Sequence, residues 1–235
     1  MRLTKMRNNE GDSRRNHQDS QHKRPRIDGE LLADSLLRII GGDDAPRATS
    51  REGIQSEENH DDRNRKDTET LEQFAKGEGL WIENADEYLQ SLYGKHFAQG
   101  SESFVYRIDK QTIIKTRSFI GYDTIANALN SIKIHNLLFP ETALKIVALG
   151  RSFDEFTAIL VQSNIEGSFA TKEEIEVFVK ERFNAVKDDS VLGGNSYKND
   201  KYLLQDLKPK NVLVRYENGK KRFYVVDGDF YYNNN

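Results

Sequence analysis

The chain has 235 residues, enough for one or two domains, and no apolar run approaches the roughly 18 residues that a membrane span needs. Its 35 basic and 38 acidic residues give a net charge of −3, so the overall charge does not favour a nucleic-acid partner. The absence of cysteine excludes disulfides, thiolate metal sites and a cysteine nucleophile, and it suits a reducing compartment. We therefore expect a cytoplasmic protein without a membrane or nucleic-acid partner.

The beginning of the chain differs in composition from the rest. All Phe, Tyr and Trp residues lie between Phe74 and Tyr232, and the preceding part consists mainly of mixed charges, Asn, Gln and Ser. Such a composition cannot offset an ordering entropy of about 1–2 kcal/mol per residue. Residues 1–69 are therefore expected to form a mostly disordered tail.

A short apolar pattern interrupts this tail between Asp28 and Gly41. Asp can cap the start of a helix and Gly its end, so the pattern predicts a short helix within residues 29–40. An isolated helix of this length is marginal in water. It is therefore either transient or a docking element for a partner or for the folded domain. The apolar residues are Leu31, Leu32, Leu36, Leu37, Ile39 and Ile40.

Residues 70–94 are expected to form a helical lead-in to the main domain. Leu71, Phe74 and Ala75 fall at helical spacing before two glycines, and residues 85–92 have the pattern of a second short helix. Trp81 lies between the two helices and is expected to anchor them in a core.

Three strands are predicted over residues 96–99, 104–108 and 112–115, joined by tight turns into an antiparallel meander. The first turn contains Gly100 and Ser101, whose backbone N–H groups suit close approach to a phosphate. The last strand ends in Lys115, whose ammonium needs an anion if it projects from a half-buried sheet. Turn and lysine together predict a triphosphate cradle, the alternative being an ordinary surface lysine in a hairpin.

A second set of polar residues lies near the other end of the chain. In the segment DLKPKNVL, Asp206 is followed by Lys208 and Asn211, and then by an apolar strand. A hairpin turn signal at residues 217–220 separates this strand from a second one, which leads to Asp227. A carboxylate that orients a hydroxyl, a cation for the moving phosphate and an Asn–Asp pair for Mg²⁺ are what phosphoryl transfer needs.

The segment DLKPKNVL resembles the catalytic loop D-x-K-x-x-N of protein kinases. The strand that ends at Lys115 is similar to the strand-three lysine motif, and Asp227-Gly228 stands where the metal-binding D-F-G motif is expected. More narrowly, residues 134–142 and 160–167 are similar to the kinase domain of polyvalent proteins, which are large multidomain proteins of phages and conjugative elements. The resemblance covers residues 95–235.

The resemblance implies an α+β fold after the disordered tail: a minimal, two-lobed, protein-kinase-like domain with an antiparallel N-lobe sheet plus a helix and a much reduced C-lobe. It implies ATP and Mg²⁺ as cofactors and a hydroxyl of a protein as the acceptor. Lys115 would bind the nucleotide phosphates and Asp206 would act as catalytic base. Lys208 would lie at the transferred phosphate, and Asn211 and Asp227 would bind Mg²⁺.

The resemblance also places a hinge that contacts adenine at Gln162, Asn164 and Ile165, after a strand over residues 157–161. The predicted helix over residues 124–138 contains no Glu or Asp, so the acidic partner of Lys115 is open between Asp123 and Glu141.

Other features depart from the kinase pattern. Leu204 and Gln205 replace the His and Arg that usually precede the catalytic Asp, so regulation through an activation-loop phosphate is not expected. Asp229 competes with Asp227 as metal ligand. The C-lobe is expected to have one helix over residues 173–183 and a flexible loop over residues 188–200. Two other functions therefore stay open: a small-molecule kinase of the aminoglycoside type, and a nucleotide-binding pseudokinase that docks partners through its tail.

Overall fold

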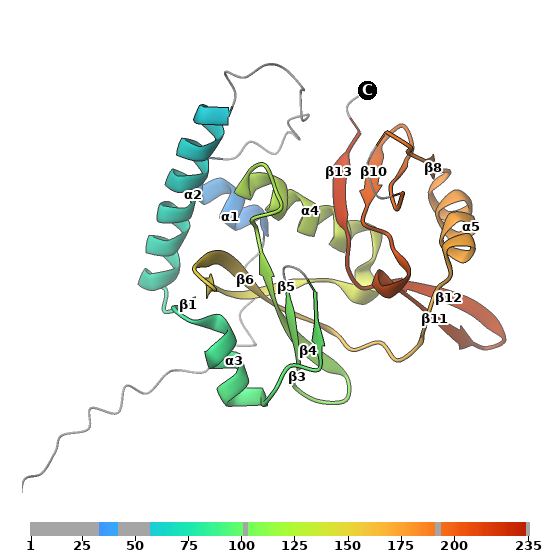
Figure 1. Cartoon of the computed structure of the whole chain (residues 1–235), viewed down its shortest axis with the longest axis horizontal. Coiled ribbons are helices and arrows are strands. Elements are labelled where there is room, and N and C mark those ends of the chain that lie inside the picture. Colours follow the sequence, from blue (N-terminus) through green and yellow to red (C-terminus); the bar gives the residue numbers. More distant parts are fainter. Residues whose placement is uncertain (1–32, 42–56, 101–102, 191–193, 234–235) are drawn as a thin grey trace, which may run out of the picture.

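A computed structural model describes residues 33–41, 57–100, 103–190 and 194–233 (Figure 1). Most of the predicted tail, and also Ser101, lie outside the described residues. The structure corrects the end of the tail, because helix α2 (Glu57–Gly77) begins before residue 69. Ion pairs at i,i+4 spacing support the polar part of α2, and its last turns bury Leu71 and Ala75. The buried turns anchor the helix, and the polar turns extend from them.

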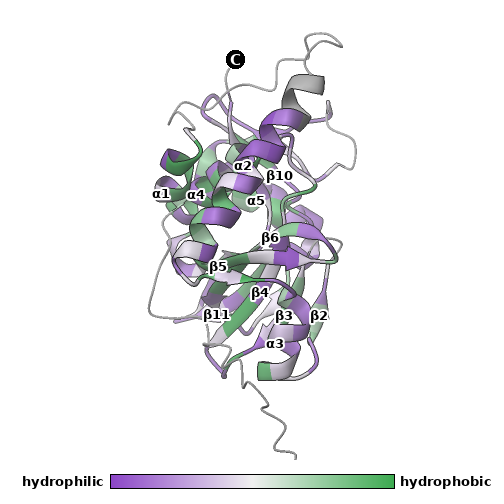
Figure 2. Cartoon of the chain, turned by 90° about the vertical axis from the view of Figure 1, so that its left-hand side faces the viewer, coloured by the Kyte–Doolittle hydropathy of each residue, from purple (hydrophilic) through white to green (hydrophobic). Residues whose placement is uncertain are grey.

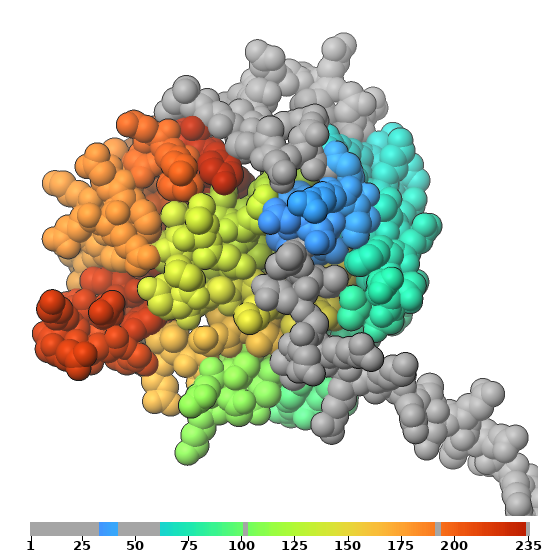
Figure 3. All heavy atoms as spheres, turned by 180° about the vertical axis from the view of Figure 1, so that it is seen from behind, coloured from blue at the N-terminus to red at the C-terminus, as the bar shows by residue number. Residues whose placement is uncertain are grey.

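Helix α1 (Ala33–Ile39) lies within the predicted range and docks on the folded domain. Leu36 and Leu37 are fully buried against α4 (Ile125–Leu138), and Asp34 pairs with Lys133 of α4 at 2.5 Å. Seen from behind, α1 lies against α4, with α2 beside it (Figure 3). Of the two alternatives for this segment, the structure therefore favours docking on the domain itself.

The first half of the molecule is built on a six-stranded sheet in the order β1-β5-β6-β4-β3-β2. Strand β1 pairs parallel to β5, and all other pairs are antiparallel, including the predicted meander β2-β3-β4. Figure 2 shows that α2 is largely hydrophilic, whereas the central residues of β5 are hydrophobic, which matches their burial. Strand β4 is also buried, although it carries polar side chains such as Lys115 and Arg117. The strands are β1 (Trp81–Ile82), β2 (Ala98–Gln99), β3 (Phe104–Arg107), β4 (Thr112–Ser118), β5 (Lys145–Ser152) and β6 (Glu155–Ser163), with α3 (Ala85–Tyr93) between β1 and β2.

Helix α4 connects the two halves of the molecule. Its buried face carries Ile125, Leu129 and Ile132, as the sequence pattern indicates, and it contacts α1 on one side and strand β13 (Asp229–Tyr232) on the other. Thr124 caps its N-terminus through a hydrogen bond from the Asn127 N–H. A 3-10 turn, η1 (Pro140–Thr142), follows α4.

The second half contains two small sheets, in the orders β13-β10-β9-β8 and β12-β11-β7, and one long helix. The predicted hairpin is present, with Asn218 and Gly219 at positive φ in its turn. The predicted flexible loop over residues 188–200 is partly wrong, because β9 buries Tyr197 and pairs with both neighbours. The elements are β7 (Ser168–Phe169), α5 (Lys172–Phe183), β8 (Val186–Lys187), β9 (Tyr197–Lys198), β10 (Tyr202–Gln205), η2 (Pro209–Asn211), β11 (Val212–Glu217) and β12 (Lys220–Val225).

Buried side chains form separate cores in the two halves. The first half has one cluster under α1, α2 and α4 and another between α3 and the sheet. The second half has a cluster centred on Phe139, Leu204 and Phe230. In the part of the chain that the structure describes, no helix has the length and apolar character to cross a bilayer.

Candidate active site

A cavity of about 660 Å³ lies where the two halves meet, a volume typical of small-molecule sites. Its walls come from β2, β3, β4 and β6 on one side and from the segments after β10 and β12 on the other. All the predicted site residues that the structure describes line this cavity: Gly100, Lys115, Gln162, Asn164, Ile165, Asp206, Lys208, Asn211 and Asp227. The structure thus brings together residues that lie more than 100 positions apart in the sequence.

The loop after β10 is held by its own polar side chains. The Asn211 Nδ2 atom donates to the carbonyl oxygen and to Oδ2 of Asp206, at 2.8 Å each. The Lys208 ammonium donates to Asp206 Oδ1 at 2.6 Å. Asp206 adopts φ +55°, a conformation that Asp tolerates better than most residues. The spacing of these three residues therefore produces one compact polar loop at the cavity wall.

Lys115 and Asp227 form an ion pair across the cavity, with 3.6 Å between Nζ and Oδ1. The ammonium also donates to the Val226 carbonyl oxygen at 3.1 Å. Burial lowers the pKa of Lys115, and the Asp227 charge partly offsets this effect. Burial by itself raises the pKa of Asp227, but the charges of Lys115 and Arg117 outweigh it and hold the pKa at about 2. The carboxylate is therefore ionised at neutral pH.

The prediction that Asp123 or Glu141 pairs with Lys115 is wrong. Both carboxylates are exposed, and the acid beside the ammonium is Asp227. Helix α4 has no acidic residue to offer, so the lysine is paired from the other half of the molecule.

Sequence reasoning missed Arg117, which is 6% exposed and also lines the cavity. Its Nη2 atom donates to Gly228 O at 3.0 Å, to Asp229 Oδ1 at 2.6 Å and to the hydroxyl of Tyr122. Its Nη1 atom lies 3.6 Å from Asp227 Oδ1. The sequence pattern could have identified Arg117, because residues two apart on a strand share a face. Arg117 therefore lies on the same face of β4 as Lys115.

Asp229, the competing metal ligand, has its own partners. Its Oδ1 atom accepts from Arg117 and from the Tyr122 hydroxyl. Both carboxylates line the cavity with about a third of the side chain exposed, but the cations beside Asp227 lie at 3.6 Å, whereas Arg117 lies 2.6 Å from Asp229. This arrangement favours Asp227 as the carboxylate that a cation would meet.

The predicted hinge residues have structural partners of their own. Gln162 is 2% exposed, and its Nε2 atom donates to Thr142 O at 2.6 Å and to Val226 O at 3.2 Å. Asn164 donates from Nδ2 to Lys110 O and from its backbone N–H to Gln111 O, which fixes the β3–β4 turn. These side chains therefore shape the cavity wall. Gly100 behaves similarly, because its N–H is bonded to Ser103 O at 2.8 Å.

The oxygen donors of the cavity suit a hard divalent cation such as Mg²⁺. Among the described residues, no group of three or more His, Asp or Glu could enclose a metal. Asp227 and Asn211 supply a carboxylate and an amide oxygen to the same cavity. Mg²⁺ typically binds one or two such protein oxygens and takes its other ligands from water and phosphates. The residues present therefore fit Mg²⁺ together with a phosphate-bearing ligand, not a protein-enclosed metal.

A family model, described as serine/threonine/tyrosine kinase found in polyvalent proteins, matches residues 64–234. The match begins within α2, so the lead-in is part of the matched region, whereas the resemblance seen in the sequence began at residue 95. No curated protein and no solved structure matches the chain. The match covers most of the chain and all the candidate site residues, and it confirms the expected kinase-like α+β fold. The chain therefore belongs to the family of serine/threonine/tyrosine kinases found in polyvalent proteins.

Proposed function

We propose that this protein is an ATP- and Mg²⁺-dependent phosphotransferase that acts in the cytoplasm on a hydroxyl group of a protein. One observation carries the proposal: Lys115 from the large sheet, the Asp206–Asn211 loop and Asp227 line a single cavity. Phosphoryl transfer depends mainly on positioning of the reactants and on electrostatic stabilisation of the phosphate charge. The charged and polar side chains of this cavity can supply both effects.

The cavity has an apolar part that suits a nucleotide base. Val105 and Ile113 line it from the large sheet, and Leu213 of β11 lines it from the second half. Two apolar walls can sandwich a flat ring, and the chain at Ser163–Ile165 borders the same space. With the base in this slot, Lys115 is the group for the phosphates, and Gly100 borders the space beside it.

The polar part of the cavity would hold the metal and the acceptor. Asp227 and the Oδ1 atom of Asn211 would hold Mg²⁺, which when bound offsets charge on the phosphates. The Asp206 carboxylate would orient the acceptor hydroxyl and take its proton as the new O–P bond forms and the bond to the ADP leaving group breaks. Lys208, which donates to Asp206, would compensate charge on the transferred phosphate.

Two alternatives have specific support. In the described part of the chain, α5 is the only α-helix after α4, so these residues by themselves offer a peptide a small surface, and a small-molecule acceptor is the first alternative. The absence of an acidic residue on α4 favours a pseudokinase. Against the pseudokinase, all four expected polar groups line the cavity and Asp227 is ionised.

A transfer assay with radiolabelled γ-phosphate and Mg²⁺ tests the proposal. Asp206→Asn keeps the shape of the side chain and tolerates positive φ, and it should lower the transfer rate about 10²- to 10⁴-fold while ATP binding persists. Asp189→Asn is the matched control, because the Asp189 side chain is 85% exposed and lies outside the cavity. Wild-type protein that binds Mg·ATP without transfer would establish the pseudokinase. Phosphorylation of small alcohols alone would establish the small-molecule kinase.

A further inference from the structure

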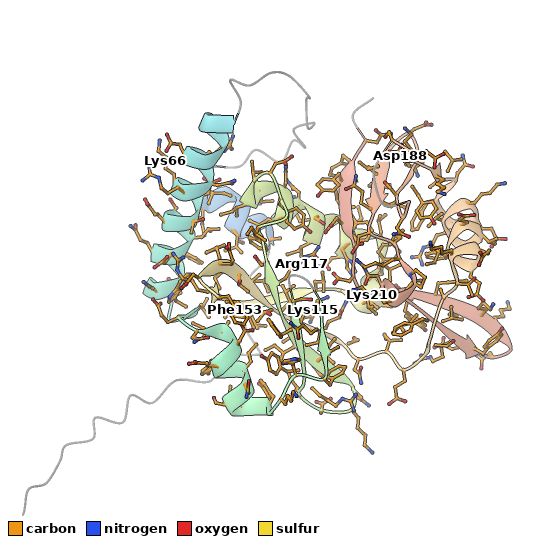
Figure 4. All side chains as sticks on the ribbon, in the orientation of Figure 1. Lys66, Lys115, Arg117, Phe153, Asp188 and Lys210 are labelled. Atoms are coloured by element: carbon orange, nitrogen blue, oxygen red, sulfur yellow. The ribbon has the colours of Figure 1, made fainter. Side chains whose placement is uncertain are left out.

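A buried guanidinium links the large sheet to the turn that carries Asp227. Arg117 lies on the same face of β4 as Lys115, and both reach across to the second half of the molecule, where Lys210 is also found (Figure 4). Arg117 contacts the turn at both the Gly228 carbonyl oxygen and the Asp229 carboxylate. Lys115 donates to the Val226 carbonyl oxygen, so β4 holds the turn on both sides of Asp227.

The charges at this place are balanced. Two cations, Lys115 and Arg117, face two carboxylates, Asp227 and Asp229. Arg117 lies 2.6 Å from Asp229 and 3.6 Å from Asp227, so Asp229 is its closer partner. A buried cation without such a partner would be costly and would turn to the nearest remaining carboxylate. Without Asp229, that carboxylate would be Asp227.

Helix α4 reaches the same turn without a carboxylate. The Ser131 hydroxyl accepts from the Phe230 N–H at 3.0 Å and lies 3.5 Å from the Tyr122 hydroxyl. Tyr122 in turn donates to Asp229, and burial raises its pKa well above the ordinary value, so it stays a proton donor. In protein kinases an acidic residue of the helix usually pairs with the strand lysine. Here β4 contacts Asp229 directly through Arg117, and α4 contacts the neighbouring Phe230 N–H through Ser131.

We propose that Arg117 and Asp229 form a positioning pair that holds the metal-binding carboxylate of Asp227 against Lys115 and keeps it available for Mg²⁺. This inference rests on the proposed function for the identity of the ligand. Asp229 is the closer partner of Arg117, so that Arg117 anchors the turn and competes less with the metal for Asp227. Neither residue needs to touch the reacting atoms.

The test compares Arg117→Gln, Asp229→Asn and the double variant, with the Mg²⁺ dependence of ATP binding as the main readout. Each single variant should weaken the apparent Mg²⁺ affinity about tenfold to a hundredfold, as loss of a group that orients a metal ligand does, with a much smaller effect on ATP binding without Mg²⁺. The double variant should be no worse than the worse single variant, because both changes break one unit. Arg151→Gln is the control: it breaks an Arg–Glu72 pair of 2.9 Å outside the cavity and should leave the Mg²⁺ dependence unchanged.

The outcomes separate this inference from the proposed function. If wild-type protein transfers phosphate and Asp229→Asn keeps the wild-type Mg²⁺ affinity, the positioning pair is refuted and the kinase stands. If wild-type protein transfers no phosphate but its ATP binding depends on Mg²⁺, the proposed phosphotransferase activity is refuted. The Mg²⁺ dependence of ATP binding in the variants then still tests the positioning pair. If the variants do not fold, Arg117→Lys replaces them. It keeps the charge but loses the planar fork, so wild-type Mg²⁺ affinity in this variant would overturn the proposal.

Discussion

Replacing Gly228 by alanine should destabilise the turn between Asp227 and Asp229. The residue has φ +152°, a conformation that L residues rarely adopt. A Cβ atom there would lie 2.8 Å from Cζ of Phe230 and 3.2 Å from the Gln205 carbonyl oxygen. The Phe230 ring is fully buried and cannot swing away, because its centroid lies 5.5 Å from those of both His135 and Phe139.

The magnitude follows from two costs and one gain. Backbone strain costs about 1–3 kcal/mol, and overpacking of a filled core costs about 1–3 kcal/mol. The alanine restricts the unfolded chain, which returns about 0.4–1 kcal/mol. The net loss is about 3 kcal/mol, which for a domain of this size lowers Tm by about 6–12 °C.

Differential scanning calorimetry at neutral pH measures this loss against a matched control. Gly219 has φ +75° in the hairpin turn, and a Cβ atom there meets nothing within 4 Å. Gly219→Ala should therefore show only the conformational cost of about 1–2 kcal/mol. If Gly228→Ala lowers Tm no more than Gly219→Ala does, the contact with Phe230 is not a packing constraint, and the reasoning is refuted.

Leu36→Ala should release α1, since a helix of seven residues depends on its buried leucines, and hydrogen exchange should accelerate at residues 33–41 but not in α5. Burial lowers the pKa of His135 to about 3, so the unfolded state binds the extra proton and stability should fall below about pH 6.5. The urea midpoint should therefore change less between pH 7 and pH 4 in His135→Leu than in the wild type. The same change in both proteins would contradict this role of His135. Thr171→Ala breaks the capping box of α5 and should lower the free energy of unfolding in urea by about 1 kcal/mol. Thr171→Ser keeps a capping hydroxyl and should retain most of this stabilisation.

Features with a local signal could be predicted from the sequence. The loop from Asp206 to Asn211 is defined by the spacing of its polar residues, and their mutual hydrogen bonds need only that segment. The hairpin turn at Asn218-Gly219 and the buried face of α4 are likewise set by neighbouring residues.

Features that depend on distant segments were predicted less completely. The resemblance to kinases places Lys115 and Asp227 in one site although 112 positions separate them, but no local pattern indicates that Lys115 forms its ion pair with Asp227 rather than with Asp123. The start of α2 was missed because its first turns are polar and are supported by ion pairs and by docking of the later turns. Strand β9 was missed because two residues in a polar segment carry too short a pattern.

The large sheet ends on both sides in strands of only two residues, β1 and β2. A strand of this length exposes few unpaired N–H and C=O groups, so it is a poor template on which another polypeptide could add a strand. The longer, mostly buried strands β4, β5 and β6 lie between these two edge strands. Self-association by sheet extension is thereby disfavoured, even at high concentration.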